Sequence, residues 1–106
     1  MQLQELMDFI GARYTFTIGN YPSLDGVTDA ERFIFAVKHS ILHMNKSIGK
    51  LAGECESYDH THARPDRRVL REVTVKMLIN TLKLAEELGI SGSELSQAVP
   101  EFMKSK

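Results

Sequence analysis

Apolar residues recur every three or four positions over two long stretches of the chain, which predicts two long helices. In the first stretch one line of apolar side chains steps by four and three: Phe33, Val37, Ile41, Met44, Ile48, Leu51 and Cys55. Thr28 and Glu31 can form a capping box before it, because the threonine hydroxyl accepts a backbone N–H while the glutamate reaches back. We therefore expect a helix over about 29–56.

The second stretch carries two adjoining apolar lines. One line contains Leu70, Val73, Met77, Thr81, Leu84 and Leu88, and the other contains Val75, Leu78, Leu82 and Ala85. Gly89 follows them, and glycine takes the left-handed conformation that ends many helices without steric cost. This pattern predicts a helix over about 66–88. Its apolar face is wider than a single partner helix would cover.

The residues before the first long helix predict smaller elements. Residues 3–14 have apolar side chains at helical spacing, which indicates a short amphipathic helix. Residues 14–18 alternate with period two and fit a brief extended segment. Residues 19–27 are rich in Gly, Asn, Pro, Ser and Asp, so a loop is expected there.

The remaining segments are a polar connection and a short C-terminal helix. Residues 56–65 break the apolar periodicity and are expected to join the two long helices. A last helix should begin at Ser91 or Ser93, either of which can cap it, and run to Phe102. Pro100 should kink or shorten this helix.

These elements predict an all-α fold in one domain, 1–106, with a helix-plus-loop extension at 1–27 and a helical core at 28–106. Two long helices joined by about ten residues should pack as an antiparallel hairpin. The wide face of the second helix is most simply covered when two hairpins form a four-helix core in a dimer. The alternative is a monomer in which the N-terminal helix and Phe16–Ile18 cover that face.

Composition narrows the classes of protein. Thirteen Lys and Arg against fourteen Asp and Glu leave a net charge of −1, which argues against a dedicated nucleic-acid binder. No run of about 18 apolar residues predicts a membrane span. The first residues lack the pattern of a signal peptide, and the single cysteine, Cys55, fits a reducing compartment, so a cytoplasmic location is expected.

A row of polar residues flanks each long helix and suggests a groove between them. The seven candidate residues are His43, Ser47, Lys50 and Glu54 on the first helix and Glu72, Lys76 and Asn80 on the second. Helical bundles often hold ligands and metals between facing helices. The alternative is a solvated flank with ordinary surface ion pairs.

Histidines and arginines form two further groups. His39 and His43 are four residues apart, a spacing that can present two imidazoles to one metal, but no glutamate follows in the metalloprotease pattern. His60 and His62 lie in the expected connection. For all four histidines we expect solvation or a place at the rim of the core, and no metal site.

A cluster of four arginines surrounds the start of the second long helix: Arg64, Arg67, Arg68 and Arg71. Positive charge there opposes the helix dipole. A bound phosphate or an acidic partner would resolve this conflict, and simple solvation is the alternative. Serine and cysteine nucleophile signatures, phosphate-binding glycine loops and paired zinc cysteines are absent, and Cys55 is expected to be a small core residue.

The stretches ILHMNKSIGKLAGE (41–54) and REVTVKMLINTLKLAEELGISGSEL (71–95) resemble the MazG-like, all-α nucleoside triphosphate pyrophosphohydrolases. The most specific part is LKLAEELGI (82–90), and the resemblance covers about 31–99. It implies dimers or tetramers of helical hairpins that cleave nucleoside triphosphates between the α and β phosphates. It also implies Mg²⁺ held by an ExxE pair and a later ExxD pair.

The chain departs from the family at the metal-binding positions. Ser47 and Lys50 stand at the ExxE positions, and Val73 and Lys76 stand at the ExxD positions. Mg²⁺ prefers carboxylate oxygens, so these residues do not make its site. The only ExxD between 29 and 76 is at 56–59, where the connection was expected to begin.

Three functions remain open. A metal-free relative would bind a nucleotide or phosphate, or act as a regulatory module, with no cofactor. An active pyrophosphohydrolase would need Mg²⁺ in an atypical site built from Glu54, Glu72 and either Asn80 or His43. A third possibility is nucleic-acid or acidic-partner binding through the arginine cluster, against which the near-neutral charge counts. Whichever function holds, a homo-oligomer, dimer or tetramer, is expected.

Overall fold

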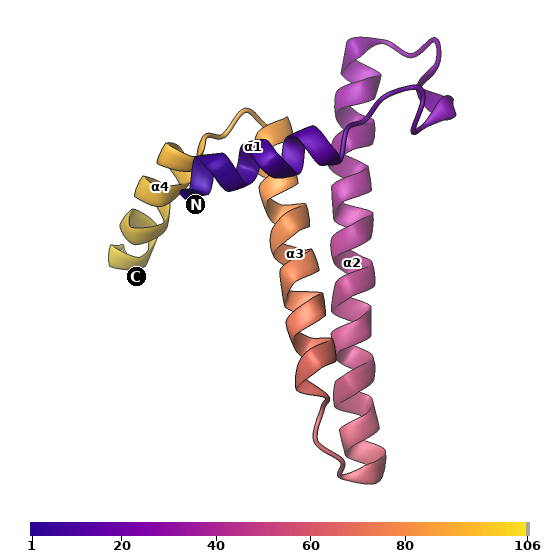
Figure 1. The fold of residues 1–106 in the computed structure, drawn as a ribbon, viewed down its shortest axis with the longest axis vertical. Coiled ribbons are helices and arrows are strands. Elements are labelled where there is room, and N and C mark those ends of the chain that lie inside the picture. Colours follow the sequence, from indigo (N-terminus) through magenta and orange to yellow (C-terminus); the bar gives the residue numbers. More distant parts are fainter. Residues whose placement is uncertain (106) are drawn as a thin grey trace.

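The computed structural model describes residues 1–105, which form four α-helices and one turn of 3₁₀ helix (Figure 1). The elements are α1 (Leu3–Arg13), the 3₁₀ turn η1 (Pro22–Leu24), α2 (Asp29–Thr61), α3 (Arg67–Glu87) and α4 (Gly92–Lys104). No strand occurs among the described residues, so the brief extended segment expected at 14–18 is irregular chain. The all-α prediction is confirmed.

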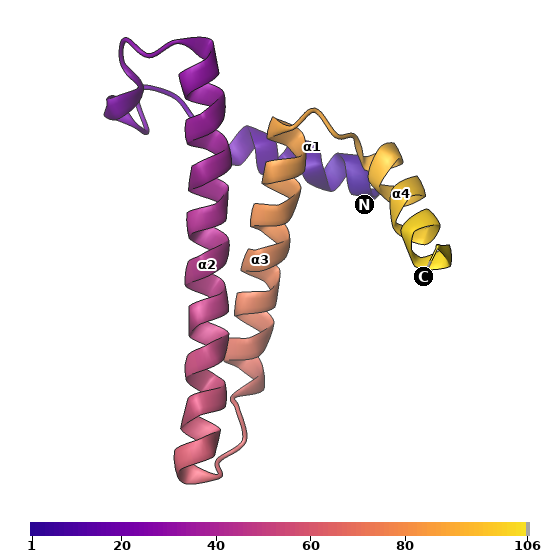
Figure 2. The same ribbon diagram turned by 180° about the vertical axis from the view of Figure 1, so that it is seen from behind.

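The long helices α2 and α3 lie side by side as an antiparallel hairpin (Figures 1 and 2). The predicted capping box is present, since the Glu31 backbone N–H donates to Thr28 Oγ1 at 3.1 Å and the Thr28 N–H donates to Glu31 Oε1 at 3.4 Å. Helix α2 ends at Thr61, five residues beyond the predicted end at 56. His62 closes it in the left-handed conformation, with φ of 58°.

The end of α2 was mispredicted because its last two turns are polar on every side. An i,i+4 pair between His60 and Glu56, with 3.6 Å between Nε2 and Oε1, helps these turns stay helical in solvent. The connection between the long helices is therefore shorter than predicted, and His60 is helical. Asp66 caps α3 by accepting the Arg68 N–H at 2.8 Å.

The turn between α3 and α4 has the two features that the sequence predicts, a left-handed glycine after α3 and a serine cap before α4. Gly89 has a φ of 73°, as its place after α3 predicted. Ser91 caps α4 by accepting the Glu94 N–H at 3.1 Å. The helix continues through Pro100 to Lys104, so the proline does not shorten it.

The core lies where α1 crosses the C-terminal half of α3. Met7 and Ile10 from α1 pack there with Leu82 and Ala85 from α3, and all four are at most 5% exposed. The N-terminal helix thus covers part of the wide apolar face of α3, as the monomeric alternative expected. Helix α4 packs on α1 through Gly92.

Gly92 allows α4 and α1 to approach each other closely. Its N–H donates to Gln4 Oε1 at 2.7 Å, and a Cβ atom at this position would lie 2.8 Å from the Gln4 backbone nitrogen. Real Cβ atoms do not make contacts of that length with backbone. Residue 92 must therefore be glycine for this packing.

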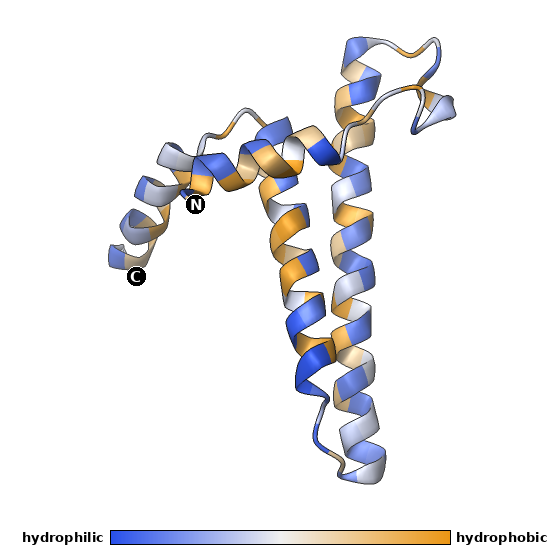
Figure 3. Ribbon diagram, viewed as in Figure 1, coloured by the Kyte–Doolittle hydropathy of each residue, from blue (hydrophilic) through white to orange (hydrophobic). Residues whose placement is uncertain are grey.

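The single chain is open, with much apolar surface uncovered. Its radius of gyration is 16.8 Å, against about 13 Å for a compact domain of this size. Its accessible surface is 7967 Å², against roughly 6,000 Å² for a folded monomer of this mass. Apolar residues line α3 beyond the crossing of α1 and recur on α2 (Figure 3).

The predicted apolar line of α2 is divided between the hairpin interface and solvent. Three members, Val37, Met44 and Leu51, are half-buried. The other four, Phe33, Ile41, Ile48 and Cys55, are exposed. Cys55 is therefore not the core residue that the sequence predicted. Separately, none of the helices in 1–105 is long and apolar enough to cross a membrane.

Candidate anion-binding cavity between the long helices

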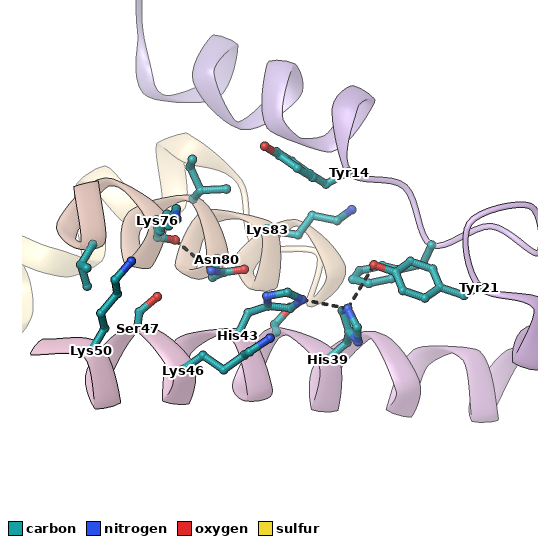
Figure 4. A pocket seen from close by; sticks show the side chains of 14 residues that line it. Tyr14, Tyr21, His39, His43, Lys46, Ser47, Lys50, Lys76, Asn80 and Lys83 are labelled. Carbon is teal, nitrogen blue, oxygen red and sulfur yellow. Dashed lines mark hydrogen bonds between the residues drawn. The ribbon is translucent and has the colours of Figure 1, made fainter. Parts of the chain in front are cut away.

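A cavity of about 910 Å³ lies between α2 and α3 and is bordered by the connection from α1 to α2 (Figure 4). Its lining residues are Tyr14, Phe16, Tyr21, His39, Ser40, His43, Lys46, Ser47, Lys50, Val73, Lys76, Ile79, Asn80 and Lys83. Five of the seven predicted groove residues are among them: His43, Ser47, Lys50, Lys76 and Asn80. Glu54 and Glu72 do not line the cavity.

Helix geometry explains why Glu72 is displaced from the cavity. The residues of α3 that line it include Val73, Lys76, Asn80 and Lys83, at steps of three and four. Glu72 lies about 100° around the helix from Val73, because each residue turns the chain by that angle. The sequence predicted that Glu72, Lys76 and Asn80 all line the groove, but only Lys76 and Asn80 do.

The lining of the cavity is strongly positive. Four lysines contribute, Lys46, Lys50, Lys76 and Lys83, and no Asp or Glu of the described range 1–105 is part of the lining. Two of these lysines have carboxylate partners on their own helix. Lys76 Nζ lies 2.9 Å from Glu72 Oε1, and Lys83 Nζ lies 2.8 Å from Glu87 Oε1 and 3.5 Å from Glu86 Oε1.

The other two lysines, Lys46 and Lys50, make no ion pair with any residue of 1–105. Lys50 is nevertheless close enough to act on Glu72. The hydrogen bond and charge of Lys76 lower the pKa of Glu72, and the charge of Lys50 lowers it further. Lysines and glutamates also occur on both long helices, but neither Lys50–Glu72 nor Lys76–Glu54 is among the ion pairs of the described residues.

Two serine side chains add hydroxyl groups to the α2 wall. Ser40 is 2% exposed, and its Oγ has no hydrogen-bond partner among residues 1–105. Ser47, two turns later, is 8% exposed. A buried hydroxyl without a partner carries an energetic cost, which a ligand or a water molecule in the cavity would relieve.

Aromatic rings and histidines close one end of the cavity. The Tyr21 hydroxyl lies 3.0 Å from His39 Nε2, which in turn lies 3.0 Å from His43 Nε2 (Figure 4). Phe35 stacks on the His39 ring, and Phe16 meets it edge-on. Burial lowers the pKa of His39 below its ordinary value, and the neighbouring His43 and Lys46 lower it further.

The remaining predicted residues lie outside this cavity. Arg64, Arg67, Arg68 and Arg71 are all exposed at the turn between α2 and α3, and none of them lines the cavity. His60 lies in the last turn of α2 and His62 caps that helix, and their neighbours are Glu56 and Tyr58. The arginine cluster is thus a separate surface.

Several lining residues were missed at the level of sequence. Ser40 and Lys46 had a usable signal, because Ser40 extends the row of His43, Ser47 and Lys50 by one turn and Lys46 adjoins Ser47. No signal in the sequence indicated that Tyr14, Phe16 and Tyr21 line the cavity. They reach the cavity from an irregular connection, whose path helical periodicity cannot predict.

The four positions that the resemblance assigns to metal carboxylates, occupied by Ser47, Lys50, Val73 and Lys76, all line this one cavity. Two of the four are lysines, so positive charge stands where the resemblance expects carboxylates. Comparisons of the chain with protein-family models, with characterised protein sequences and with solved structures find no match.

Proposed function

We propose that this chain is a binding module for a phosphorylated small molecule, a nucleotide or a related phosphate ester, which lies between α2 and α3. The observation that carries the proposal is the charge of the cavity: its lining has four lysines, of which Lys46 and Lys50 have no ion pair within 1–105, and none of the carboxylate residues in that range. Ammonium groups that share a cavity repel one another, and an anion bound among them removes that repulsion. Phosphate oxygens also accept the charge-assisted hydrogen bonds that lysine donates.

The two unpaired lysines are the main phosphate ligands in this proposal. Lys46 and Lys50 are one turn apart on α2 and flank Ser47. The buried hydroxyl of Ser40 supplies a further donor on the same wall. A volume of about 910 Å³ falls within the range of small-molecule and cofactor sites.

The same residues favour binding without Mg²⁺ over hydrolysis with it. Mg²⁺ is held by carboxylates and phosphates and keeps several waters. Glu54 and Glu72, on which an atypical metal site would depend, do not line the cavity, and Glu72 is engaged with Lys76. These residues therefore support a binding or regulatory role better than they support pyrophosphohydrolase activity.

The test is calorimetric titration of the protein with inorganic phosphate, pyrophosphate, AMP and ATP, each with EDTA and with Mg²⁺. We expect binding in EDTA, and Lys50→Gln should weaken it by about 10-fold or more, the loss typical of one hydrogen bond to a charged group. The matched control is Lys38→Gln, since Lys38 is also an exposed lysine of α2 but does not line the cavity. Absence of binding to all four compounds, or equal losses in both variants, would refute the proposal. Release of pyrophosphate from ATP with Mg²⁺ would instead support the enzyme alternative.

We also propose that the partner of the uncovered apolar surface is a second copy of this chain. The accessible surface exceeds that of a compact monomer by roughly 2,000 Å², whereas a stable interface covers about 800 Å² on each partner. The Thr81 hydroxyl meets the Met44 sulfur at 3.6 Å, and neither residue lines the cavity. The exposed Ile41 and Ile48 are each about one turn from Met44, and the exposed Leu78 is about one turn from Thr81, so they border one side of the hairpin.

Two aspartate substitutions separate assembly from folding. Leu78 is 51% exposed, so Leu78→Asp should leave the chain helical but shift it to a smaller species in sedimentation. Leu82 is 4% exposed in the core with α1, so Leu82→Asp should unfold the chain itself. A wild-type protein that sediments as a monomer at all concentrations would refute the second-copy proposal and leave the phosphate proposal untouched.

A further inference from the structure

Three donor atoms meet at the aromatic end of the cavity. His39 and His43 lie one turn apart on α2, and their Nε2 atoms are 3.0 Å from each other. The Tyr21 hydroxyl, from the connection before α2, lies 3.0 Å from the same His39 nitrogen (Figure 4). An imidazole nitrogen offers a single in-plane direction, either for an N–H or for a lone pair. His39 Nε2 therefore cannot make two well-aligned hydrogen bonds at once.

These spacings match those of ligands around a metal ion. With metal–nitrogen distances of about 2.0–2.1 Å, two ligands at right angles are about 2.9 Å apart, while tetrahedral ligands are about 3.3–3.4 Å apart. The two observed separations of 3.0 Å are nearer the right-angled value. Right-angled sites with nitrogen and oxygen ligands are typical of Cu²⁺ and Ni²⁺.

We propose that His39, His43 and Tyr21 form a binding site for a divalent transition-metal ion of the Cu²⁺ or Ni²⁺ type. This departs from the sequence-based expectation of no metal, which could not place Tyr21 beside the two histidines. Within 1–105 no group of three His, Cys, Asp or Glu side chains could hold a metal ion. The proposed site therefore takes its third ligand from the Tyr21 phenol, which would release its proton to solvent on binding the metal as tyrosinate. All three side chains line the cavity.

The surroundings hold the His39 ring in place. Phe35 stacks on it with ring centres 5.3 Å apart and an angle of 16°, while Phe16 and Tyr21 meet it edge-on at 5.6 Å and 4.8 Å. Metal ligands are usually oriented by hydrogen bonds to their other nitrogen. Packing between aromatic rings supplies that orientation here. His43 is exposed, and its Nε2 already lies 3.0 Å from that of His39.

The charges around the site select the kind of metal. The positive charge of Lys46 opposes any bound cation, and Lys83 Nζ lies 5.0 Å from the Phe16 ring centre at the same end. A hard cation held by electrostatics alone is therefore disfavoured, whereas ions that bond strongly to imidazole are not.

The test is titration of tag-free, EDTA-treated protein with Cu²⁺ alone, by calorimetry and by electron paramagnetic resonance. We expect one Cu²⁺ per chain with couplings to two imidazole nitrogens. His43→Gln should weaken binding by more than about 100-fold, above the 10–100-fold typical of losing an outer partner of a metal ligand. Tyr21→Phe should abolish the tyrosinate-to-copper absorption band.

The chain contains its own control in its second pair of histidines. His60 and His62 are exposed and lie near Glu56 and Tyr58, so His60→Gln with His62→Gln should leave the Cu²⁺ site intact. Unchanged Cu²⁺ binding in His43→Gln, or loss only in this control variant, would overturn the proposal, and circular dichroism checks that each variant is folded. The proposal does not rest on the phosphate ligand, because phosphate titrations in EDTA test that ligand separately.

Discussion

Two lysines of α3 allow a direct test of how burial determines the contribution of an ion pair to the free energy of unfolding. Lys76 and Lys83 each pair with a glutamate four residues away, with Nζ–Oε1 distances of 2.9 Å and 2.8 Å. Their side chains differ in exposure, 53% for Lys76 and 7% for Lys83. We predict that Lys83→Met destabilises the fold markedly, while Lys76→Met changes stability within the error of measurement, because an exposed pair is screened by solvent.

The expected loss for Lys83→Met follows from the groups that it leaves behind. Breaking a fully buried pair costs about 3–5 kcal/mol, since the remaining charge is left without a partner. Here the remaining carboxylates are partly solvated, with Glu87 24% and Glu86 40% exposed, so we expect about 2 kcal/mol. For a domain of this size that corresponds to a fall in Tm of about 8–16 °C.

Urea and thermal unfolding at one fixed protein concentration measure both variants, because oligomers have concentration-dependent stability. Adding Glu87→Gln to Lys83→Met should recover part of the loss, since the carboxylate left without a partner is then gone. Equal stability of Lys76→Met and Lys83→Met would refute the reasoning, as would a double variant that is less stable than Lys83→Met alone.

Four further outcomes are expected. Burial, and then the charges of His43 and Lys46, lower the pKa of His39 in the folded chain. The unfolded chain therefore binds more protons below about pH 6.5, so the stability that His39 contributes should be fully present above that pH and be lost as the pH falls; His39→Gln should flatten this slope in pH-dependent urea unfolding. Ser40→Ala removes an unsatisfied buried hydroxyl, so it should keep or raise the Tm of the unliganded protein but weaken phosphate binding in calorimetry. Gly92→Ala should lower the Tm and loosen α4, seen as faster amide exchange there, because its Cβ would collide with Gln4. Added Mg²⁺ should leave the Tm unchanged in a thermal scan, because no carboxylate lines the cavity.

Helix positions were predictable where apolar residues repeat or where a cap is specific. Thr28 and Gly89 marked a start and an end correctly because each signal is a local chemical one. The end of α2 at Thr61 was not predictable in the same way. Its final turns present polar residues on every side, and a solvated helix carries no apolar periodicity to detect.

The cavity was predictable along the helices and not across the connection. Rows of polar residues on α2 and α3 located one wall each, but two predicted residues, Glu54 and Glu72, do not line the cavity. The end of the cavity formed by Tyr14, Phe16 and Tyr21 depends on how an irregular segment folds back on α2. Such non-local packing has no counterpart in sequence spacing, and for that reason the contact of Tyr21 with His39 was missed.

The apolar line that the sequence predicts on α2 consists of two sets of residues that differ in burial. Val37, Met44 and Leu51 are spaced by seven residues and face the hairpin, whereas Ile41, Ile48 and Cys55, also spaced by seven, are exposed. The two sets lie about 40° apart around the helix, because four residues exceed one full turn by that angle. One neighbouring helix covers the first set only, and within 1–105 α1 is engaged on α3, so the second set is left exposed. Sequence periodicity therefore identifies the apolar side of a helix, but it does not tell which part of that side the neighbouring helix covers.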